Sequence, residues 1–345
     1  MIARPDPDVL CDVCADVLLS ADHSHRITRC GICFVILALA VLQCSCGGSQ
    51  NPAQTMTTHV PINTGTGWTD SPFISSDGQR LYFMYSRYNF APWILSGGTV
   101  MPLATGPDRP GLHHSSQPFD ESDIYVAIKN PDGTWSEATN LGLNGAYGDS
   151  SGMEINGGDT FLWLQGNGST NNIVMADKNP DGTWRSPVDL GTAINDHTAN
   201  VIQDNPHISP DGSALWFTSS RAGGAGGKDI WFSGNTNGVW SQPVNSGTPV
   251  NTTGDDDQIW ISPVGPDVYW NGPQGLMHCL SNGSNCAAAP EIVTIPGCDI
   301  AAEASLPDDG SSMYFGCFDL ATGVIRIMYS MKQPNGSWGA ATPVD

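Results

Sequence analysis

The segment Asn-Pro-Asp-Gly-Thr-Trp occurs twice in this 345-residue chain, at residues 130–135 and 179–184, and looser copies end at Trp240 and Trp338. The steps from Trp135 to Trp184, to Trp240 and to Trp338 are 49, 56 and 98 residues, so the last step is twice the first. A period near 50 residues is typical of repeat architectures, in which each unit packs on its neighbours. The chain is therefore predicted to be an array of repeats rather than one mixed core.

Each repeat contains the same succession of strand signals. In the clearest one, a first strand runs into an Asp-Gly turn at 206–212, an aromatic-rich second strand follows at 215–218, and a third lies at 229–232. The Asp-Gly-x-Trp segment then leads into a fourth strand. Asp-Gly and Asn-Gly allow the positive φ angles of tight hairpins, and β-branched and aromatic residues suit a pleated surface. Four antiparallel strands per repeat are typical of a propeller blade.

Counting these units predicts an all-β fold, a five-bladed β-propeller of four-stranded antiparallel blades, preceded by a signal peptide. The propeller is expected over residues 65–345, with blades at about 65–145, 146–198, 199–252, 253–297 and 298–345. Blades two and four are degenerate, because 156–159 and 262–265 replace the Asp-Gly turn. Residues 55–63 are expected to lie beside 338–344 and close the ring, although a complete fifth blade also closes without them.

The best repeat resembles a known family. Residues 206–221 read Pro-x-Ile-Ser-Pro-Asp-Gly-x-x-Leu-x-Phe-x-Ser-x-Arg, and Gly-Gly, Asp-Ile-Trp and a Trp-x-x-Pro-Val-Asn segment follow. This pattern resembles the TolB-type, WD40-like β-propeller repeat, and the resemblance covers about residues 65–345. It implies a bacterial envelope protein, lipid-anchored or secreted, that serves in protein binding or scaffolding without catalysis. Because one fold hosts many functions, the resemblance predicts the fold more sharply than the activity.

The N-terminal segment carries a targeting signal. Residues 31–42 are almost wholly apolar and follow Arg26 and Arg29, which is typical of a signal peptide and is short for a membrane span. The region after it resembles a bacterial lipoprotein signal. We expect a signal segment at 1–45, acylation at Cys46 with Cys44 as the alternative, and a tether at 46–64. The predicted location is extracytoplasmic, at the periplasm, outer membrane or cell surface, with membrane contact through the lipid anchor only.

The cysteines fall into two groups. Two Cys-x-x-Cys pairs at 11–14 and 30–33 match the spacing of a four-cysteine zinc site, but the second pair adjoins the apolar segment, so no zinc site is expected. The remaining four lie in the last two blades. In an oxidising compartment they are expected to pair as Cys279 with Cys286 and Cys298 with Cys317. Four cysteines permit three pairings, so the sequence leaves the choice open.

The net charge of −21 limits the partners. Nucleic-acid binding needs clustered Lys and Arg, and the chain has only 13 of them against 34 acidic residues. An envelope protein or a glycan is therefore the expected partner. No cofactor is expected apart from calcium, for which the run Asp255, Asp256 and Asp257 is the candidate site, because hard cations bind several oxygens.

One face of the ring is the predicted ligand-binding face. The connections between strands two and three, and between consecutive blades, emerge on the same side, where functional loops usually gather. Blade one carries about 32 extra residues there, within 87–122, and blade three adds a glycine-rich loop after Arg221. The alternative is that the insertion is only a lid. The predicted ligand-binding residues are Arg87, Trp93, Arg109, His113, His114, Asp149 and Arg221.

Catalysis is the alternative function. Arabinanase-like glycoside hydrolases are five-bladed propellers that place acids from separate blades around the axis, and Asp70, Asp204, Asp257 and Glu303 are the candidates here. These acids recur at nearly the same repeat position, which favours an architectural role. A sialidase function is not supported, because the repeated turns read Asp-Gly where the sialidase box needs Asp-x-Gly, and the arginine set that grips a carboxylate is missing. A serine hydrolase function is not supported, because no set of His, Asp and Ser has a distinctive spacing. A third hypothesis is a protein-binding hub that uses the rim of the disc.

Overall fold

The computed structural model describes residues 61–143, 145–166, 171–281 and 286–345. The predicted signal segment, Cys46 and most of the tether lie outside the described residues. The chain divides into Met1–Thr57 and a compact unit, Thr58–Asp345. Every described strand pairing and core cluster lies within this second unit, which therefore contains the whole described fold.

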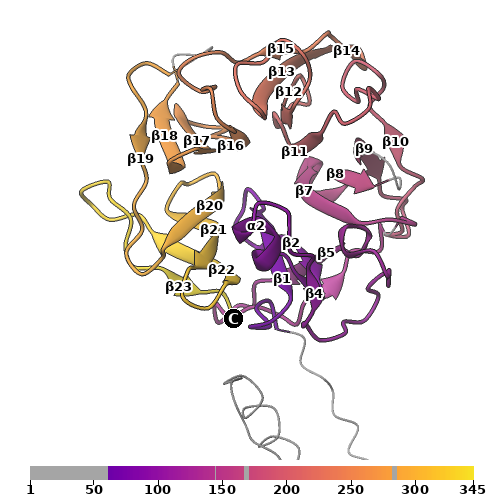
Figure 1. Cartoon of the computed structure of the whole chain (residues 1–345), viewed down its shortest axis with the longest axis vertical. Helices are drawn as coiled ribbons and strands as arrows, with labels where there is room; N and C mark the ends of the chain where they lie inside the picture. Colours follow the sequence, from indigo (N-terminus) through magenta and orange to yellow (C-terminus); the bar gives the residue numbers. More distant parts are fainter. Residues whose placement is uncertain (1–60, 144, 167–170, 282–285) are drawn as a thin grey trace, which may run out of the picture. The chain divides into compact units, whose positions relative to one another are not determined.

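Five antiparallel sheets of the second unit surround a common centre (Figure 1). Their innermost strands contact one another in sequence, from blade one to blade five and back to blade one. Within the described ranges, no helix has the length and apolar character needed to cross a membrane. The prediction of an all-β, five-bladed propeller is confirmed.

The strands of each blade follow the chain outward from the centre. Blade one contains β1 (Trp68–Ile74), β2 (Arg80–Ser86), β5 (Asp123–Ile128) and β6 (Thr139–Asn140). Blade two contains β7 (Asp149–Ile155), β8 (Thr160–Gly166), β9 (Asn171–Asp177) and β10 (Val188–Asp189). Blade three contains β11 (Gln203–Ile208), β12 (Ala214–Ser219) and β13 (Asp229–Thr236), which pairs with both β14 (Val239–Trp240) and β15 (Val244–Asn245).

Blades four and five repeat this arrangement. Blade four contains β16 (Asp257–Ile261), β17 (Asp267–Gly272), β18 (Gly275–Leu280) and β19 (Glu291–Ile292). Blade five contains β20 (Ile300–Ser305), β21 (Ser312–Asp319), β22 (Val324–Met331) and β23 (Thr342–Pro343). The blade-one insertion forms β3 (Tyr88–Asn89), the short helix α2 (Ala91–Leu95), β4 (Leu103–Ala104) and the 3-10 turn η2 (Pro118–Asp120). A second 3-10 turn, η3 (Asn156–Gly158), replaces the Asp-Gly turn of blade two.

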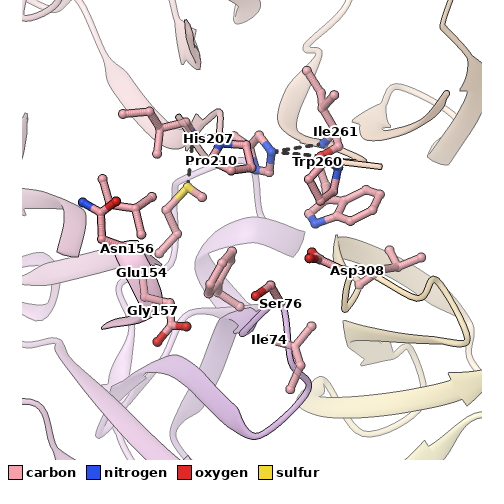
Figure 2. Close-up of a pocket in the computed structure, with 16 residues that line it drawn as sticks. Ile74, Ser76, Glu154, Asn156, Gly157, His207, Pro210, Trp260, Ile261 and Asp308 are labelled. Atoms are coloured by element: carbon pink, nitrogen blue, oxygen red, sulfur yellow. Dashed lines mark hydrogen bonds between the residues drawn. The ribbon is translucent and has the colours of Figure 1, made fainter. Parts of the chain in front are cut away.

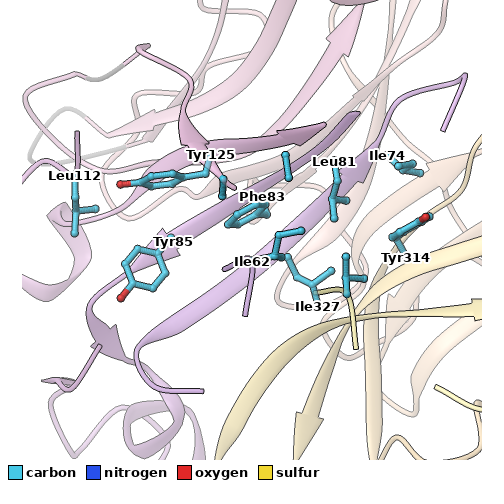
Figure 3. Close-up of a cluster of buried hydrophobic side chains, with 12 residues drawn as sticks. Ile62, Ile74, Leu81, Phe83, Tyr85, Leu112, Tyr125, Tyr314 and Ile327 are labelled. Carbon is cyan, nitrogen blue, oxygen red and sulfur yellow. The ribbon is translucent and has the colours of Figure 1, made fainter. Parts of the chain in front are cut away.

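The hydrophobic core lies between adjacent blades. Aromatic residues of the second strands are fully buried there, and they include Phe83, Phe161, Phe217 and Phe315. Figure 3 shows the cluster at the junction of blades one and five, where Phe83 and Leu81 meet Tyr314 and Ile327. Because each blade buries its face against the next, a single blade cannot supply its own core.

The repeated Asp-Gly-x-Trp segments fasten the outer edges of the blades. Trp135, Trp184 and Trp338 each form a β-bridge with a lysine six residues earlier, and each lysine Nζ lies 4.7–5.8 Å from the centre of that tryptophan's ring. Trp184 Nε1 also donates a hydrogen bond to Leu141 O of the preceding blade (2.9 Å). The sequence repeat thus marks a contact at the rim rather than a functional site.

A second repeated element fills the junctions between blades. One buried aliphatic residue lies in the segment that leads into the innermost strand of each blade: Ile62, Leu143, Ile194, Val250 and Ile295. Three of these are followed by an asparagine whose side chain bonds both the amide and the carbonyl of a third-strand residue, and in two of them Asn195 bonds Ile173 and Asn251 bonds Ile230. Asn63, which follows Ile62, brackets Ile327 of blade five in the same way.

The ring therefore closes through residues 61–63. Asn63 Nδ2 donates to Ile327 O (2.9 Å) and Val344 O (2.8 Å), and Ile327 N donates to Asn63 Oδ1 (2.8 Å). These residues form no strand, since the outer strand of blade five is β23 from the chain's own C-terminal segment. Residues 61–63 supply the junction that follows blade five and form no added strand, and residues 55–60 of the expected closing segment lie outside the described residues.

Two disulfides lie in the last two blades. Cys279 of β18 is bonded to Cys286, and Cys298 is bonded to Cys317 of β21. The second one joins the segment that leads into blade five to that blade's second strand. Both connect residues close in sequence, so they stabilise local structure rather than the closure of the ring.

We expect Asn63→Ala to lower the free energy of unfolding by about 1–3 kcal/mol, because it leaves the buried amide of Ile327 without a partner and removes one of the two hydrogen bonds to Ile327 O. Urea denaturation measures the loss. Thr66→Ala, at an exposed neighbour, is the control and is expected to change stability by less than about 0.5 kcal/mol. Equal stability of the two variants would contradict closure through Asn63.

Candidate functional site

The innermost strand of every blade contains the same irregularity. The register of each inner pair shifts at one point, and the bulged residue has a positive φ between 44° and 61°. The five residues are Ser71, Ser151, Asn205, Gln258 and Glu303. Positive φ is uncommon outside glycine, and a bulge redirects side chains. The repeated bulge places polar side chains near the axis.

Hydrogen bonds between these positions link all five blades, and we call this ring the axial belt. Ser71 of blade one contacts both neighbouring blades: its N donates to Glu303 Oε2 (2.6 Å), and its hydroxyl lies 3.4 Å from that of Ser151. Ser151 Oγ in turn donates to Asp204 Oδ1 (3.3 Å). Asn205 Nδ2 donates to Asp257 Oδ1 (2.6 Å), and Glu303 N donates to Asn271 Oδ1 (2.9 Å). Each contact joins one blade to the next. The predicted acids Asp204, Asp257 and Glu303 are therefore part of the contacts between blades.

A lysine balances the acids of blades three and four. Lys228 Nζ donates to Asp257 Oδ2, and Thr218 Oγ1 donates to Asp257 Oδ1 (2.7 Å). Burial acts to raise the pKa of Asp257, but the Lys228 ammonium and these hydrogen bonds hold it below its usual value. Burial and the charge of Asp257 raise the pKa of Asp204 to about 6. Asp204 is thus the first of this pair to take up a proton as the pH falls, and Asp257 is the last.

The other two acids lie at the junction of blades five and one. Burial and the neighbouring Asp70 carboxylate raise the pKa of Glu303 well above its usual range. Asp70 itself accepts a hydrogen bond from Trp68 Nε1 (2.9 Å). The belt therefore sets Asp257 beside a lysine that favours its ionised form and Glu303 beside an acid that favours its protonated form, which limits the repulsion between carboxylates at the axis.

A pocket opens at the opposite end of the channel, where the turns between first and second strands lie. Its cavity volume is about 270 Å³, and a narrow section of about 40 Å³ leads from it toward the belt. Figure 2 shows its wall, to which all five blades contribute. Most of the lining is apolar: Phe73, Ile74, Met153, Ile155, Ile208, Trp260, Ile261 and Leu306. We call this cavity the axial pocket.

Two ionisable groups in the wall of the axial pocket, Glu154 and His207, are bonded within the protein. Glu154 accepts two hydrogen bonds from Arg80 (2.7 and 2.8 Å) and one from Tyr82 (2.6 Å). The amide and carbonyl of Ile261 both lie within hydrogen-bond distance of His207 Nε2 (3.3 and 3.2 Å). Burial lowers the pKa of His207 to about 4, so its ring is neutral at pH 7. The pocket thus presents a mostly apolar wall to a ligand, and its other acid, Asp308, is exposed to solvent.

Two predicted ligand-binding arginines hold the junctions between blades. Arg109 is 3% exposed, donates to Pro61 O (2.7 Å) and Ile62 O (2.9 Å), and lies 4.1 Å over the Tyr85 ring. Arg221 donates to Ala193 O (3.1 Å) and Ile194 O (2.5 Å) and lies 4.7 Å over Phe217. Each guanidinium therefore clamps the segment that enters its blade.

The remaining residues predicted for the ligand-binding face are spread over blades one and two. Arg87 is paired with the buried Glu121 (2.6 Å), and His114 lies 3.2 Å from Asp108 at the surface. The His113 amide donates to Asp123. Asp149 turns away from the axis and accepts from Trp163 Nε1 (2.9 Å). Trp93 is 36% exposed and packs on Phe119.

The three aspartates proposed for calcium have different partners. Asp255 accepts from Lys228 N (2.9 Å), Asp256 accepts from the amide and hydroxyl of Thr252, and Asp257 belongs to the axial belt. Among the residues that the structure describes, no group of three or more His, Cys, Asp or Glu side chains is arranged to hold a metal ion. The calcium site at these residues therefore stays a prediction, for which no cluster of ligands is found among the described residues.

Sequence reasoning missed the residues that line the axial pocket. Phe73, Met153, His207 and Trp260 each lie three residues after Asp70, Ser150, Asp204 and Asp257, which are equivalent positions in the register of the inner strands. Aligning the repeats on the Ile-Ser pairs at 74–75, 208–209 and 261–262 would have shown that Phe73, His207 and Trp260 correspond, but blade two has no such pair. The side chains differ in chemistry, so no repeated letter pointed to them.

No protein-family model matches this chain, and no curated protein matches it. Similar solved structures include TolB from Acinetobacter baumannii, with 15% identity, a TM-score of 0.44 and coverage of 79% of this chain and 53% of that one. The putative TolB from Agrobacterium tumefaciens has 14% identity, a TM-score of 0.43 and coverage of 81% of each chain. A GH43 β-xylosidase/α-arabinofuranosidase from a compost microbial metagenome has 11% identity, a TM-score of 0.47 and coverage of 82% and 97%.

The chain thus spans about half the length of the Acinetobacter baumannii TolB chain. The TolB-type propeller fold that the repeat of residues 206–221 predicts is the fold found here, and its assignment rests on the five sheets themselves. The similarities concern the fold alone, so function has to be argued from the site.

The neutral state of His207 predicts a pH dependence of stability. Its pKa falls from 6.5 in the unfolded chain to about 4 in the folded protein. Between these values the unfolded chain binds more protons, so this residue's contribution is complete above pH 6.5 and is lost as the pH falls toward 4. The loss amounts to about 3 kcal/mol. Comparing wild type with His207→Gln by urea denaturation at pH 7.5 and 4.5 isolates this contribution from those of the buried acids.

We expect acid to destabilise wild type more than His207→Gln. An equal loss in both proteins between the two pH values would show that His207 titrates normally in the folded state.

Proposed function

We propose that this protein is a non-catalytic binding propeller of the cell envelope, and that its axial pocket receives an apolar side chain of a partner protein. The observation that carries the proposal is the pocket itself, with about 270 Å³ of space, walls from five blades and mostly apolar lining. Binding sites are typically concave and apolar with few polar groups. The volume suits one side chain of the size of leucine or phenylalanine.

Two features support an extracytoplasmic location. Cys279–Cys286 and Cys298–Cys317 are bonded, and disulfides persist in oxidising compartments. The apolar segment 31–42 has the character of a signal peptide, and Cys46 follows it at the distance expected for a lipid anchor. The protein is therefore proposed to work at a membrane surface, tethered through residues 46–60.

The glycoside hydrolase alternative depends on the four axial carboxylates. Asp204, Asp257 and Glu303 accept hydrogen bonds that join blades, and Asp257 also accepts one from Lys228 Nζ. Hydrolysis of a glycosidic bond needs one carboxyl group free to protonate the leaving oxygen and another free to act on water or the sugar. The engagement of these groups in the axial belt favours an architectural role and supports the binding function.

A methyl NMR titration tests the axial pocket. N-acetyl-leucinamide and N-acetylphenylalaninamide serve as probes, and we expect them to shift the Met153 methyl signal saturably at millimolar concentration. Ile155→Asp places a charge in the half-buried pocket wall and is expected to weaken the titration at least tenfold. Met101, which is 54% exposed on the insertion, is the internal control and should not shift.

Equal shifts of Met101 and Met153, or no shift of either, would contradict binding in the axial pocket. Incubation with arabinan and xylan tests the alternative. We expect no release of reducing sugar, and release that is lost in Asp257→Asn would assign the axial acids to catalysis instead.

A further inference from the structure

The blade-one insertion exposes an unusual amount of apolar surface. Leu95 is 61% exposed and Leu103 is 66% exposed, and neighbouring side chains are also open to solvent. We call this set the insertion patch: Trp93, Ile94, Leu95, Val100, Met101, Leu103 and Phe119. Apolar patches of this kind mark sites of interaction with a protein or a membrane.

The insertion patch rests on a packed base. Ala91 of α2 is buried with Trp68 of β1 and with Phe318 and Ile325 of blade five. Phe90 packs edge-on against Trp68, with ring centres 5.8 Å apart, and Trp93 packs against Phe119 at 5.2 Å. The β3–β4 ladder joins the two arms of the insertion. The patch is therefore held outward by contacts beneath it.

The charge pattern limits what the patch can contact. Residues 88–107 contain no Asp, Glu, Lys or Arg, although the whole chain carries a net charge of −21. Anionic surfaces repel such a protein, and the patch offers no cation to attract them. A neutral, apolar surface has no such penalty. Tryptophan with exposed leucine, isoleucine and methionine is the composition that enters the interface of a bilayer.

The chain enters the propeller beside the insertion. Arg109 of the insertion holds Pro61 O and Ile62 O, and Gly67 N donates to Thr105 Oγ1 (3.2 Å) next to β4. Cys46 lies 15 residues before Pro61, and that length of chain spans at most about 50 Å. An anchor at Cys46 and the insertion patch can therefore reach the same bilayer.

We propose that the insertion patch docks on the surface of a neutral phospholipid bilayer, as a second membrane contact besides the lipid anchor. This inference rests on the membrane location in the proposed function. Stable membrane anchoring takes two signals, and a contact through the protein surface also orients the propeller on the bilayer. Docking through this face leaves the axial pocket directed away from the bilayer, because the pocket opens at the turn end of β1 and the insertion leaves β2 at the other end.

Vesicle flotation tests the proposal with the compact unit Thr58–Asp345, which lacks Cys46 and contains all described strand pairings. We expect it to bind phosphatidylcholine vesicles and the double variant Leu95→Ser/Leu103→Ser to bind at least tenfold more weakly. The control Val239→Ser/Val244→Ser changes two residues of blade three that are 70% and 63% exposed, and it should bind like the wild type. Circular dichroism checks the fold of each variant.

Three results would overturn the proposal. Vesicle binding could be absent, or equal in all three proteins. The unit could instead form a dimer in light scattering that Leu95→Ser/Leu103→Ser dissociates, which would assign the patch to self-association. The Met153 titration is independent of these readouts, so failure of membrane docking and failure of pocket binding are distinguishable.

Discussion

The bulge in each innermost strand is the constraint on which the rest of the propeller depends. It holds Ser71, Ser151, Asn205, Gln258 and Glu303 at positive φ, which costs roughly 1 kcal/mol or more for each non-glycine residue. In exchange, the bulges allow a ring of hydrogen bonds around the axis, one at every junction between blades. Because the strands converge there, these short contacts fix the relative placement of five sheets whose apolar cores lie further out.

The axial belt also indicates which role the acids at the centre of the ring have. Acids from different blades around one channel are what a glycosidase requires, and they are also what a ring of polar contacts requires. The hydrogen-bond partners of the acids distinguish a catalytic role from a structural one. Asp257 has Lys228, Asn205 and Thr218 around it, and Glu303 accepts from the backbone of the next blade. The belt closes one end of the channel with polar contacts, and the apolar pocket lies at the other end.

The fold could be predicted because its signal is local and repeated. The Asp-Gly-x-Trp turns, the aromatic second strands and the 49-residue step follow from contacts that every blade makes with its neighbour. The site was less accessible. Asp204 and Asp257 were found by recurrence. Thr218 and Lys228, which affect the pKa of Asp257, come from strand two of blade three and from the residue just before its strand three. Arg109 and Arg221 look like exposed loop arginines in sequence, and only the fold shows that they turn inward to hold Ile62 and Ile194.

The central claim is that the axial carboxylates join the blades, and a double-mutant cycle on Lys228 and Asp257 tests it most directly. Lys228→Met, Asp257→Asn and the double variant are compared with wild type by urea denaturation. The account predicts that each single variant loses about 2 kcal/mol, and that the double variant loses at least about 1 kcal/mol less than the sum, because both changes break the same contact. Single variants as stable as the wild type, with losses that simply add, would contradict the role of the axial belt.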